Sequence, residues 1–316
     1  MKRNVIVGAA GSGTGFAAIT SLRKNWGDGV FIVGLDTNPR QLVTASLLVD
    51  KFVQVPFASE PSFWETLQSE AVMLGESFFM PLLPEEVLAV ARQGTLVSAV
   101  QSLKVIGTEL NAAEAILDKF TLFQKAHQSG MPCPKTELAK RGVTYSREFL
   151  LKPRFGYGSK GISRTSEGQL PAEVATPEDY IVQDYIHGPE LTIDAFHQRS
   201  TGFTWSVCRE RIEVKSGVSV KCRLFREKKF DEMASALASV FKLNGAFCFQ
   251  VIQSPSGPKL IDLNPRPGAG TSMSALTGND FFKAGFSLAF DEEYERCFAP
   301  FDEEVFVTRQ YVDFLS

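Results

Sequence analysis

Short apolar runs alternate with amphipathic stretches over the first hundred residues. Runs at 4–8, 30–35, 52–55 and 77–80 predict buried strands, and the spacing of apolar residues at 16–22 and 84–92 predicts helices. Strands that alternate with helices are typical of a parallel sheet. We therefore expect an α/β, Rossmann-like domain at the N-terminus.

Farther along the chain, the apolar runs are joined mainly by turns. Residues 149–152, 179–186, 191–196 and 207–212 predict strands, and 230–241 has helical spacing. Asn111 is a predicted cap for a helix that continues through Lys125. This part of the chain is expected to be of mixed, α+β organisation.

Three oxygen-bearing side chains are predicted to meet on one hairpin. Residues 247–252 and 260–264 are expected to pair around a turn at 254–258, which places Gln250 opposite Asp262. Side chains alternate along a strand, so Asn264 shares the face of Asp262. Mg²⁺ prefers such ligands and takes its remaining ones from water and phosphates. The alternative is an ordinary hairpin with a polar exposed face.

A glycine-rich stretch follows the strand at 149–152. Its glycines, Gly156, Gly158 and Gly161, alternate with polar residues that include Ser159 and Lys160. Backbone N–H groups of such a loop can surround phosphate oxygens, and Lys152 and Lys160 add positive charge. The order differs from that of a P-loop, and a plain glycine hairpin is the alternative.

Other polar positions have two interpretations each. Glu190 is a candidate for holding ribose hydroxyls or is a surface turn residue, and Arg209 and Arg211 either bind a carboxylate or form a solvated strand face. The loop at 11–16 departs from GxGxxG because Phe16 takes the place of the third glycine, and Asp36 is better explained as a turn residue.

Composition excludes several classes of protein. A charged fraction of 22% and a net charge of −3 give no basic excess for nucleic acid or an anionic membrane. The five cysteines lack a CxxC pair and the three histidines lack metal-ligand spacing, which argues against a disulfide framework or a zinc centre. We expect a cytoplasmic protein, with a homodimer as the default oligomeric state.

In their order along the chain, these motifs resemble the ATP-grasp superfamily, above all the ATP-grasp domains of the carbamoyl-phosphate synthetase large chain and small carboxylate–amine ligases. The resemblance is carried by Lys119, by Lys152-Pro with the glycine loop, by 183–186 with Glu190, and by Gln250 with Asp262-x-Asn264-Pro-x-Arg266. It implies a pre-ATP-grasp domain at 1–107, a small lid lobe at 108–188 and a large lobe at 189–316.

The resemblance also implies roles for individual residues. Lys119, Lys152 and the loop from Gly156 to Gly161 contact the nucleotide phosphates, Glu190 holds the ribose, and the adenine is lined by Gln183, Asp184, Tyr185 and Ile186. Gln250, Asp262 and Asn264 bind magnesium, with manganese as an alternative ion, and Arg266 faces the transferred phosphate. Many relatives carry Glu in place of Asp262, so this chain has a shorter carboxylate there. Some relatives carry an acid in place of Gln250, and the neutral amide makes this site less negative than theirs.

The predicted activity is an ATP-dependent ligation of a small carboxylate to an amine or ammonia through an acyl phosphate. Arg209 and Arg211 are expected to bind the substrate carboxylate. A non-catalytic ATP sensor of the same fold is the main alternative, and a nicotinamide oxidoreductase that uses the N-terminal lobe is a weaker one.

Overall fold

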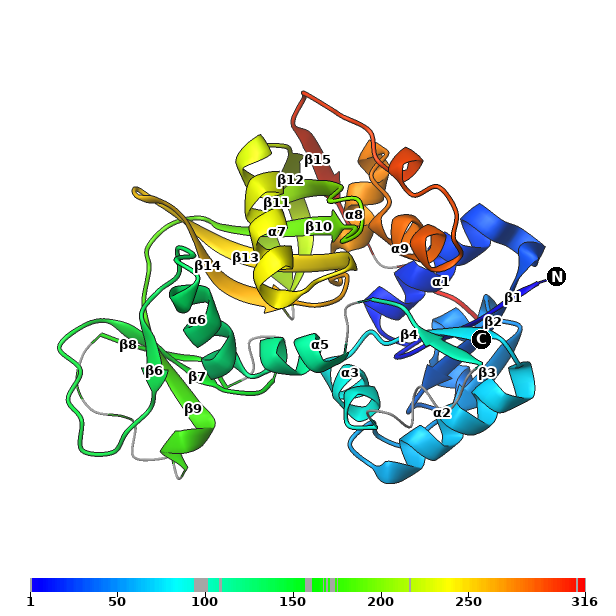
Figure 1. The fold of residues 1–316 in the computed structure, drawn as a ribbon, viewed down its shortest axis with the longest axis horizontal. Helices are drawn as coiled ribbons and strands as arrows, with labels where there is room; N and C mark the ends of the chain where they lie inside the picture. Colours follow the sequence, from blue (N-terminus) through cyan, green and yellow to red (C-terminus); the bar gives the residue numbers. More distant parts are fainter. Residues whose placement is uncertain are drawn as a thin grey trace.

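The computed structural model describes residues 2–315 except 94–101, 108–109, 157–160, 167, 169, 171–173, 175, 216 and 311. Three sheets organise the described chain (Figure 1). The first lies at one end of the molecule, the smallest lies at the other end, and the largest lies above and between them.

The first sheet has five parallel strands in the order β3-β2-β1-β4-β5. The strands are β1 (Arg3–Val7), β2 (Val30–Asp36), β3 (Lys51–Gln54), β4 (Ser77–Met80) and β5 (Leu103–Val105), with helices α1 (Gly13–Trp26), α2 (Pro61–Leu74) and α3 (Pro84–Ala91). Val5 and Val7 pack in one apolar cluster and Ile6 in another, so both faces of the sheet are covered. The predicted parallel α/β fold is confirmed.

The small sheet is antiparallel, in the order β6-β9-β7-β8. Its strands are β6 (Thr136–Leu138), β7 (Phe149–Pro153), β8 (Ser163–Thr165) and β9 (Tyr180–Asp184), and helices α5 (Leu110–Leu117) and α6 (Lys119–Gln128) lead into it. The prediction of a single helix that continues through Lys125 is wrong, because two helices occupy this stretch. Asp118 divides it, because its side chain accepts from the Phe120 amide at 3.1 Å and caps a second helix.

The large sheet has six strands in the order β14-β13-β10-β11-β12-β15, all paired antiparallel. The strands are β10 (Glu190–His197), β11 (Thr204–Lys215), β12 (Val218–Phe225), β13 (Gly245–Ser254), β14 (Gly257–Asn264) and β15 (Val305–Thr308). Helix α7 (Lys228–Phe241) covers one face, where Phe230, Leu237 and Phe241 join the main apolar cluster.

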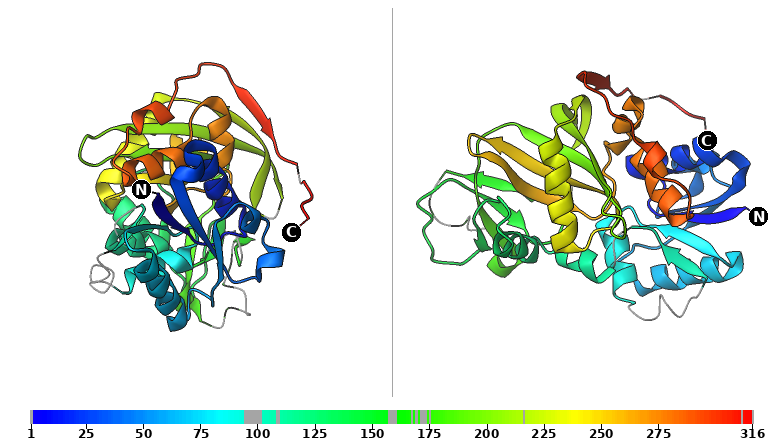
Figure 2. Two further views of the ribbon diagram at one scale, coloured as in Figure 1. Left: turned by 90° about the vertical axis from the view of Figure 1, so that its right-hand side faces the viewer. Right: turned by 45° about the horizontal axis from the view of Figure 1, so that its top comes forward.

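Helix α9 (Phe281–Ala289), which follows the short helix α8 (Thr271–Ser274), connects the large sheet with the first domain (Figure 2). Phe281 packs in the cluster beneath the large sheet, whereas Phe282 and Phe286 pack with β1 and α1. The Ser21 hydroxyl also donates to Asp280 at 3.1 Å. The C-terminal third of the chain therefore fixes the first domain against the large sheet.

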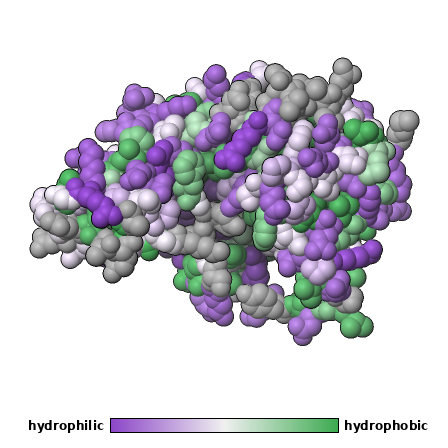
Figure 3. Space-filling model, turned by 90° about the horizontal axis from the view of Figure 1, so that it is seen from below, coloured by the Kyte–Doolittle hydropathy of each residue, from purple (hydrophilic) through white to green (hydrophobic). Residues whose placement is uncertain are grey.

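On the face shown in Figure 3, hydrophilic and hydrophobic residues are interspersed. Across the ranges that the structure describes, no helix combines the length and the apolar character needed to cross a membrane.

Candidate active site

One face of the large sheet carries the polar residues singled out in the sequence. Cross-strand pairing aligns Arg209 with Thr192, Thr192 with Gln250, and Gln250 with Asp262. Directly paired residues of an antiparallel sheet point to the same face. The neighbouring row, Ile193, Phe249 and Leu263, packs on the opposite face in the main apolar cluster. Alternation along the strands thus places these polar residues on the face opposite the main apolar cluster. Farther along, the same face carries a second buried cluster that includes Phe196 and Leu224.

The hairpin of β13 and β14 has the predicted pairing, with Gln250 opposite Asp262. Asn264 donates from Nδ2 to Asp262 Oδ2 at 3.1 Å, and Gln250 donates from Nε2 to Glu190 Oε1 at 2.6 Å. Because both amides use their nitrogens in these bonds, their oxygens are the atoms left for a cation. The predicted convergence is confirmed, and the role of these residues as ligands stays a prediction.

These three side chains suit a magnesium ion that takes its other ligands from water and a substrate, and they are too few to hold a metal without such ligands. One carboxylate and two amide oxygens are hard ligands, and such a site is completed by water and phosphate oxygens. Within the described part of the chain, no three His, Cys, Asp or Glu residues gather in a way that could hold a metal. An ion at Asp262 therefore depends on ligands that a substrate brings.

Lys152 brings the small sheet close to this face. Lys152 is only 6% exposed, and this burial lowers the pKa of its ammonium group to about 8. The negative charges of Asp262 and Glu190 raise the pKa, and the positive charge of Lys119 lowers it. Nζ donates to Gln183 Oε1 at 2.7 Å. Groups from two sheets and from helix α6 therefore share one electrostatic environment.

Lys119 lies at the predicted phosphate loop. Its Nζ donates to the carbonyl of Gly156 at 2.7 Å. Gly156 and Gly161 have φ values of 129° and 72°, a region that favours glycine. Gly158, Ser159 and Lys160, which were also predicted to contact phosphates, lie outside the described residues.

The residues predicted to surround the adenine follow one another across the end of β9. Gln183 is buried and bonds Lys152, while Asp184 pairs with Arg147. The Tyr185 ring lies 3.9 Å from the Arg164 guanidinium carbon. Ile186 is half-buried. The side chains of Asp184 and Tyr185 thus each contact an arginine. The contact of residues 183–186 with an adenine ring stays a prediction.

Glu190, the predicted ribose ligand, lies at the start of β10 beside the metal candidates. Its Oε1 accepts from Arg211 Nη1 at 2.5 Å as well as from Gln250. Arg211 also donates from Nη2 to the Gly217 carbonyl at 2.9 Å. Arg211 is therefore held beside Glu190 at the polar face.

Arg209 differs from the prediction that it binds a substrate carboxylate directly. Its side chain is 4% exposed and forms a two-point ion pair with Asp194, from Nε at 3.1 Å and from Nη2 at 2.9 Å. A guanidinium buried in this way is committed to its protein partner. The sequence placed Arg209 and Arg211 on one strand face but gave no sign of Asp194 as a partner.

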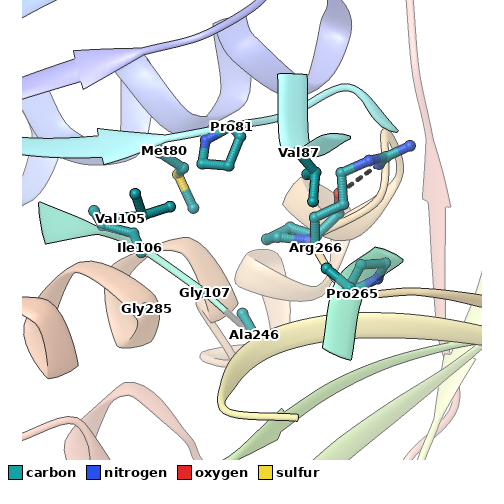
Figure 4. Close-up of a pocket in the computed structure, with 12 residues that line it drawn as sticks. Met80, Pro81, Val87, Val105, Ile106, Gly107, Ala246, Pro265, Arg266 and Gly285 are labelled. Carbon is teal, nitrogen blue, oxygen red and sulfur yellow. Dashed lines mark hydrogen bonds between the residues drawn. The ribbon is translucent and has the colours of Figure 1, made fainter. Parts of the chain in front are cut away.

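Arg266 lines a small pocket between the first domain and the large sheet (Figure 4). In this view, Val87 and Arg266 lie on the right of the pocket, Met80 and Val105 lie on the left, and Ala246 lies below. Arg266 donates from Nη1 to the Pro267 carbonyl at 2.9 Å. Its Nε is buried and has no hydrogen-bond partner among the described residues.

Glu86 is a buried carboxylate near Arg266 that the sequence analysis missed. Burial raises the pKa of Glu86 to about 7. Hydrogen bonds to the backbone at Leu82, Leu83 and Ala9, and the positive charge of Arg266, act to lower this pKa but do not outweigh the burial. Its Oε2 accepts from Leu82 at 2.7 Å and from Leu83 at 3.1 Å. A Glu three residues after a helix-start position is the signal that could have revealed it.

The N-terminal glycine loop uses Asp36 for its own structure. The Gly11 amide donates to Asp36 Oδ2 at 2.7 Å and the Asn38 amide to Oδ1 at 2.9 Å. This agrees with the interpretation of Asp36 as a turn residue and weakens the oxidoreductase alternative, in which it holds a ribose.

Comparison with known proteins identifies a family match over the part of the chain that contains the candidate site. A sequence family described as the ATP-grasp domain matches residues 116–270. None of the curated proteins matches the chain significantly.

Many solved structures share the fold. N5-carboxyaminoimidazole ribonucleotide synthetase from Thermotoga maritima has a TM-score of 0.65 at 16% identity, over 93% of this chain and 77% of that one. The Staphylococcus aureus N5-carboxyaminoimidazole synthetase complexed with ADP gives 0.70 at 13%, over 93% and 79%. The biotin carboxylase domain of Hydrogenobacter thermophilus 2-oxoglutarate carboxylase, a dimer solved with MgADP and bicarbonate, gives 0.70 at 15%, over 93% and 70%.

Proposed function

Because this chain belongs to the ATP-grasp superfamily, with its ATP-grasp domain at residues 116–270, we propose that it is an ATP-dependent carboxylate–amine ligase. The observation that carries the proposal is the position of Lys152. This lysine of the small sheet is influenced by Asp262 and Glu190 of the large sheet and by Lys119 beside the glycine loop. Two cations and two anions from separate elements thus meet at the junction of the sheets.

The proposed reaction has two steps. A substrate carboxylate oxygen attacks the γ-phosphorus of ATP, the bond to the bridging oxygen breaks, and ADP leaves. The nitrogen of an amine or ammonia then attacks the acyl carbon, and phosphate leaves with the C–O electron pair while the nitrogen loses a proton. Phosphorylation is required because a carboxylate oxygen is a poor leaving group.

In this proposal, the chain's residues mainly position groups and offset charge. Lys119 and Lys152 attract the nucleotide phosphates, Glu190 holds the ribose hydroxyls, and Arg266 faces the transferred phosphate. Gln250, Asp262 and Asn264 hold magnesium, which when bound neutralises charge on the phosphate oxygens. Manganese has no support from the relatives, whose bound metal, where one is named, is magnesium.

The other assignments of residues follow from the same proposal. The loop at 156–161 closes over the phosphates and limits attack by water on the acyl phosphate. Residues 183–186 line the adenine. We assign 1–107, 108–188 and 189–316 as the pre-ATP-grasp domain, the lid lobe and the large lobe. Arg211, beside Glu190, is retained as a contact for the substrate carboxylate, whereas Arg209 is not.

A phosphate-release screen tests the function. The full chain with Mg-ATP is given amino acids, other small carboxylates and bicarbonate, with and without ammonia. We expect release of ADP and phosphate with a matching pair of substrates and its loss in Asp262→Ala. Binding of ATP without ADP release under any pair would instead favour the sensor.

A further inference from the structure

Asp194 is a fully buried carboxylate at the centre of the large sheet that the proposed reaction does not use. It accepts hydrogen bonds from Thr271 Oγ1 and Ser274 Oγ, both at 2.7 Å, in addition to the two from Arg209. A buried charge requires such compensation, and removal of one partner is costly. Asp194 therefore connects strands β10 and β11 to helix α8.

The segment 265–274, which we term the anchored segment, lies directly on this ion pair. A Cβ added at Gly270 would lie 2.2 Å from Arg209 Nη1, so any other residue there would have to displace the buried guanidinium. The Gly268 amide donates to Thr271 Oγ1 at 2.8 Å. One hydroxyl thus accepts from the segment's backbone and donates to Asp194.

A second contact holds the anchored segment from the side of β15. Arg309 donates from Nη2 to the Ala269 carbonyl at 3.2 Å and to Ser272 Oγ at 3.1 Å. The segment is therefore fixed at both its sheet-facing and its outer side.

The anchored segment begins at the proposed metal and phosphate ligands. Asn264 is the last residue of β14, and it lies in the cross-strand row that contains Cys248 and Asp194. Arg266 is two residues farther on, between Asn264 and the attachment at Gly268. A small shift of the segment would move Arg266 while leaving β13 and β14 in register.

We propose that Asp194 and Thr271 are positioning residues, which together with Arg209 hold the anchored segment so that Arg266 faces the transferred phosphate. This inference rests on the proposed function. It predicts that loosening the segment slows phosphate transfer much more than it weakens nucleotide binding, since Lys152 and Lys119 lie on other elements.

Two substitutions at one position test the proposal. Thr271→Val keeps the size of the side chain but removes both hydrogen bonds of the hydroxyl, and Thr271→Ser keeps the hydroxyl. We expect Thr271→Val to lower kcat for phosphate release by about 10- to 100-fold with the KM for ATP changed by about twofold or less, and Thr271→Ser to restore most of the rate. Equal rates in the two variants, or a loss that falls on KM and not on kcat, would overturn it.

Hydrogen exchange separates this inference from the proposed function. In the full-length protein without substrates, amides of the anchored segment should exchange faster in Thr271→Val than in Thr271→Ser, while those of β1 and β2 should stay unchanged. This result would support the role of Thr271 in holding the anchored segment even if the wild-type protein releases no phosphate. Unchanged exchange within the segment, or faster exchange throughout the protein, refutes it.

Discussion

Lys152 and Gln183 are diagonal neighbours on adjacent strands of the small sheet, with the lysine Nζ 2.7 Å from the amide Oε1 of the glutamine. The pair places a buried ammonium next to a neutral group. Burial accordingly holds the pKa of Lys152 at about 8, below its ordinary value of 10.5.

Nucleotide binding is therefore expected to be coupled to proton uptake at Lys152. Between pH 8 and 9, a large fraction of this lysine is neutral in the free protein. Bound phosphates favour the charged form and raise its pKa, so protons are taken up. Calorimetry of ADP or ATP binding at pH 8.5, in buffers of different ionisation enthalpy, measures the number of protons.

Lys152→Arg is the control, because arginine remains charged at this pH. Its binding enthalpy should be independent of the buffer. Equal proton uptake in the variant and the wild-type protein would show that another group titrates.

Asp262 is expected to dominate the affinity for magnesium. Asp262→Asn keeps the size of the side chain but removes the one carboxylate of the donor set. Phosphate release should fall by about 100-fold or more, with a higher magnesium concentration needed for half-maximal rate. Glu213→Gln, which removes a partly exposed carboxylate paired with Lys221 on the same sheet, should change neither quantity. An unaltered magnesium titration in Asp262→Asn would exclude Asp262 as a ligand.

Glu86 should make the stability of the protein depend on pH. Its pKa in the folded protein is about 7, against 4.5 for the ordinary group, so the folded state binds the proton more tightly. The stabilisation is complete below pH 4.5 and is lost as pH rises to 7. From the difference in pKa, the free energy of unfolding should fall by up to about 3 kcal/mol over this range.

Urea unfolding of the wild-type protein and of Glu86→Gln at several pH values measures this effect. The amide cannot ionise, so the variant should lack this part of the pH dependence. Parallel curves for the two proteins would contradict the assignment.

Two glycines of helix α1 should respond differently to alanine. A Cβ at Gly15 would lie 2.2 Å from the Ala9 carbonyl oxygen. A Cβ at Gly13 would have no atom of the described structure within 4 Å apart from its chain neighbours and the backbone of its own helix. Gly15→Ala should therefore lower the free energy of unfolding by about 1–3 kcal/mol through overpacking. Gly13→Ala should be neutral or stabilising by about 0.4–1 kcal/mol. Urea unfolding compares the two, and similar effects would mean that the loop adapts freely.

The sequence by itself determined the features that depend on local pattern. The pairing of Gln250 with Asp262 follows from two strands joined by a short turn, because the turn fixes the register and the alternation fixes the face. The parallel first sheet follows in the same way from strands that alternate with helices. The order of motifs along the chain was sufficient to indicate the ATP-grasp family.

Only the tertiary structure decided which distant groups became partners. It divided the predicted helix at Asp118, buried Arg209 against Asp194 and placed Glu86 near Arg266. The partner of a buried charge depends on which segments pack over it, and segments far apart in sequence impose no periodicity on one another. Periodicity could therefore assign Arg209 to a face of its strand, whereas only the packing of residues 268–274 over that face showed that the arginine is enclosed by the protein.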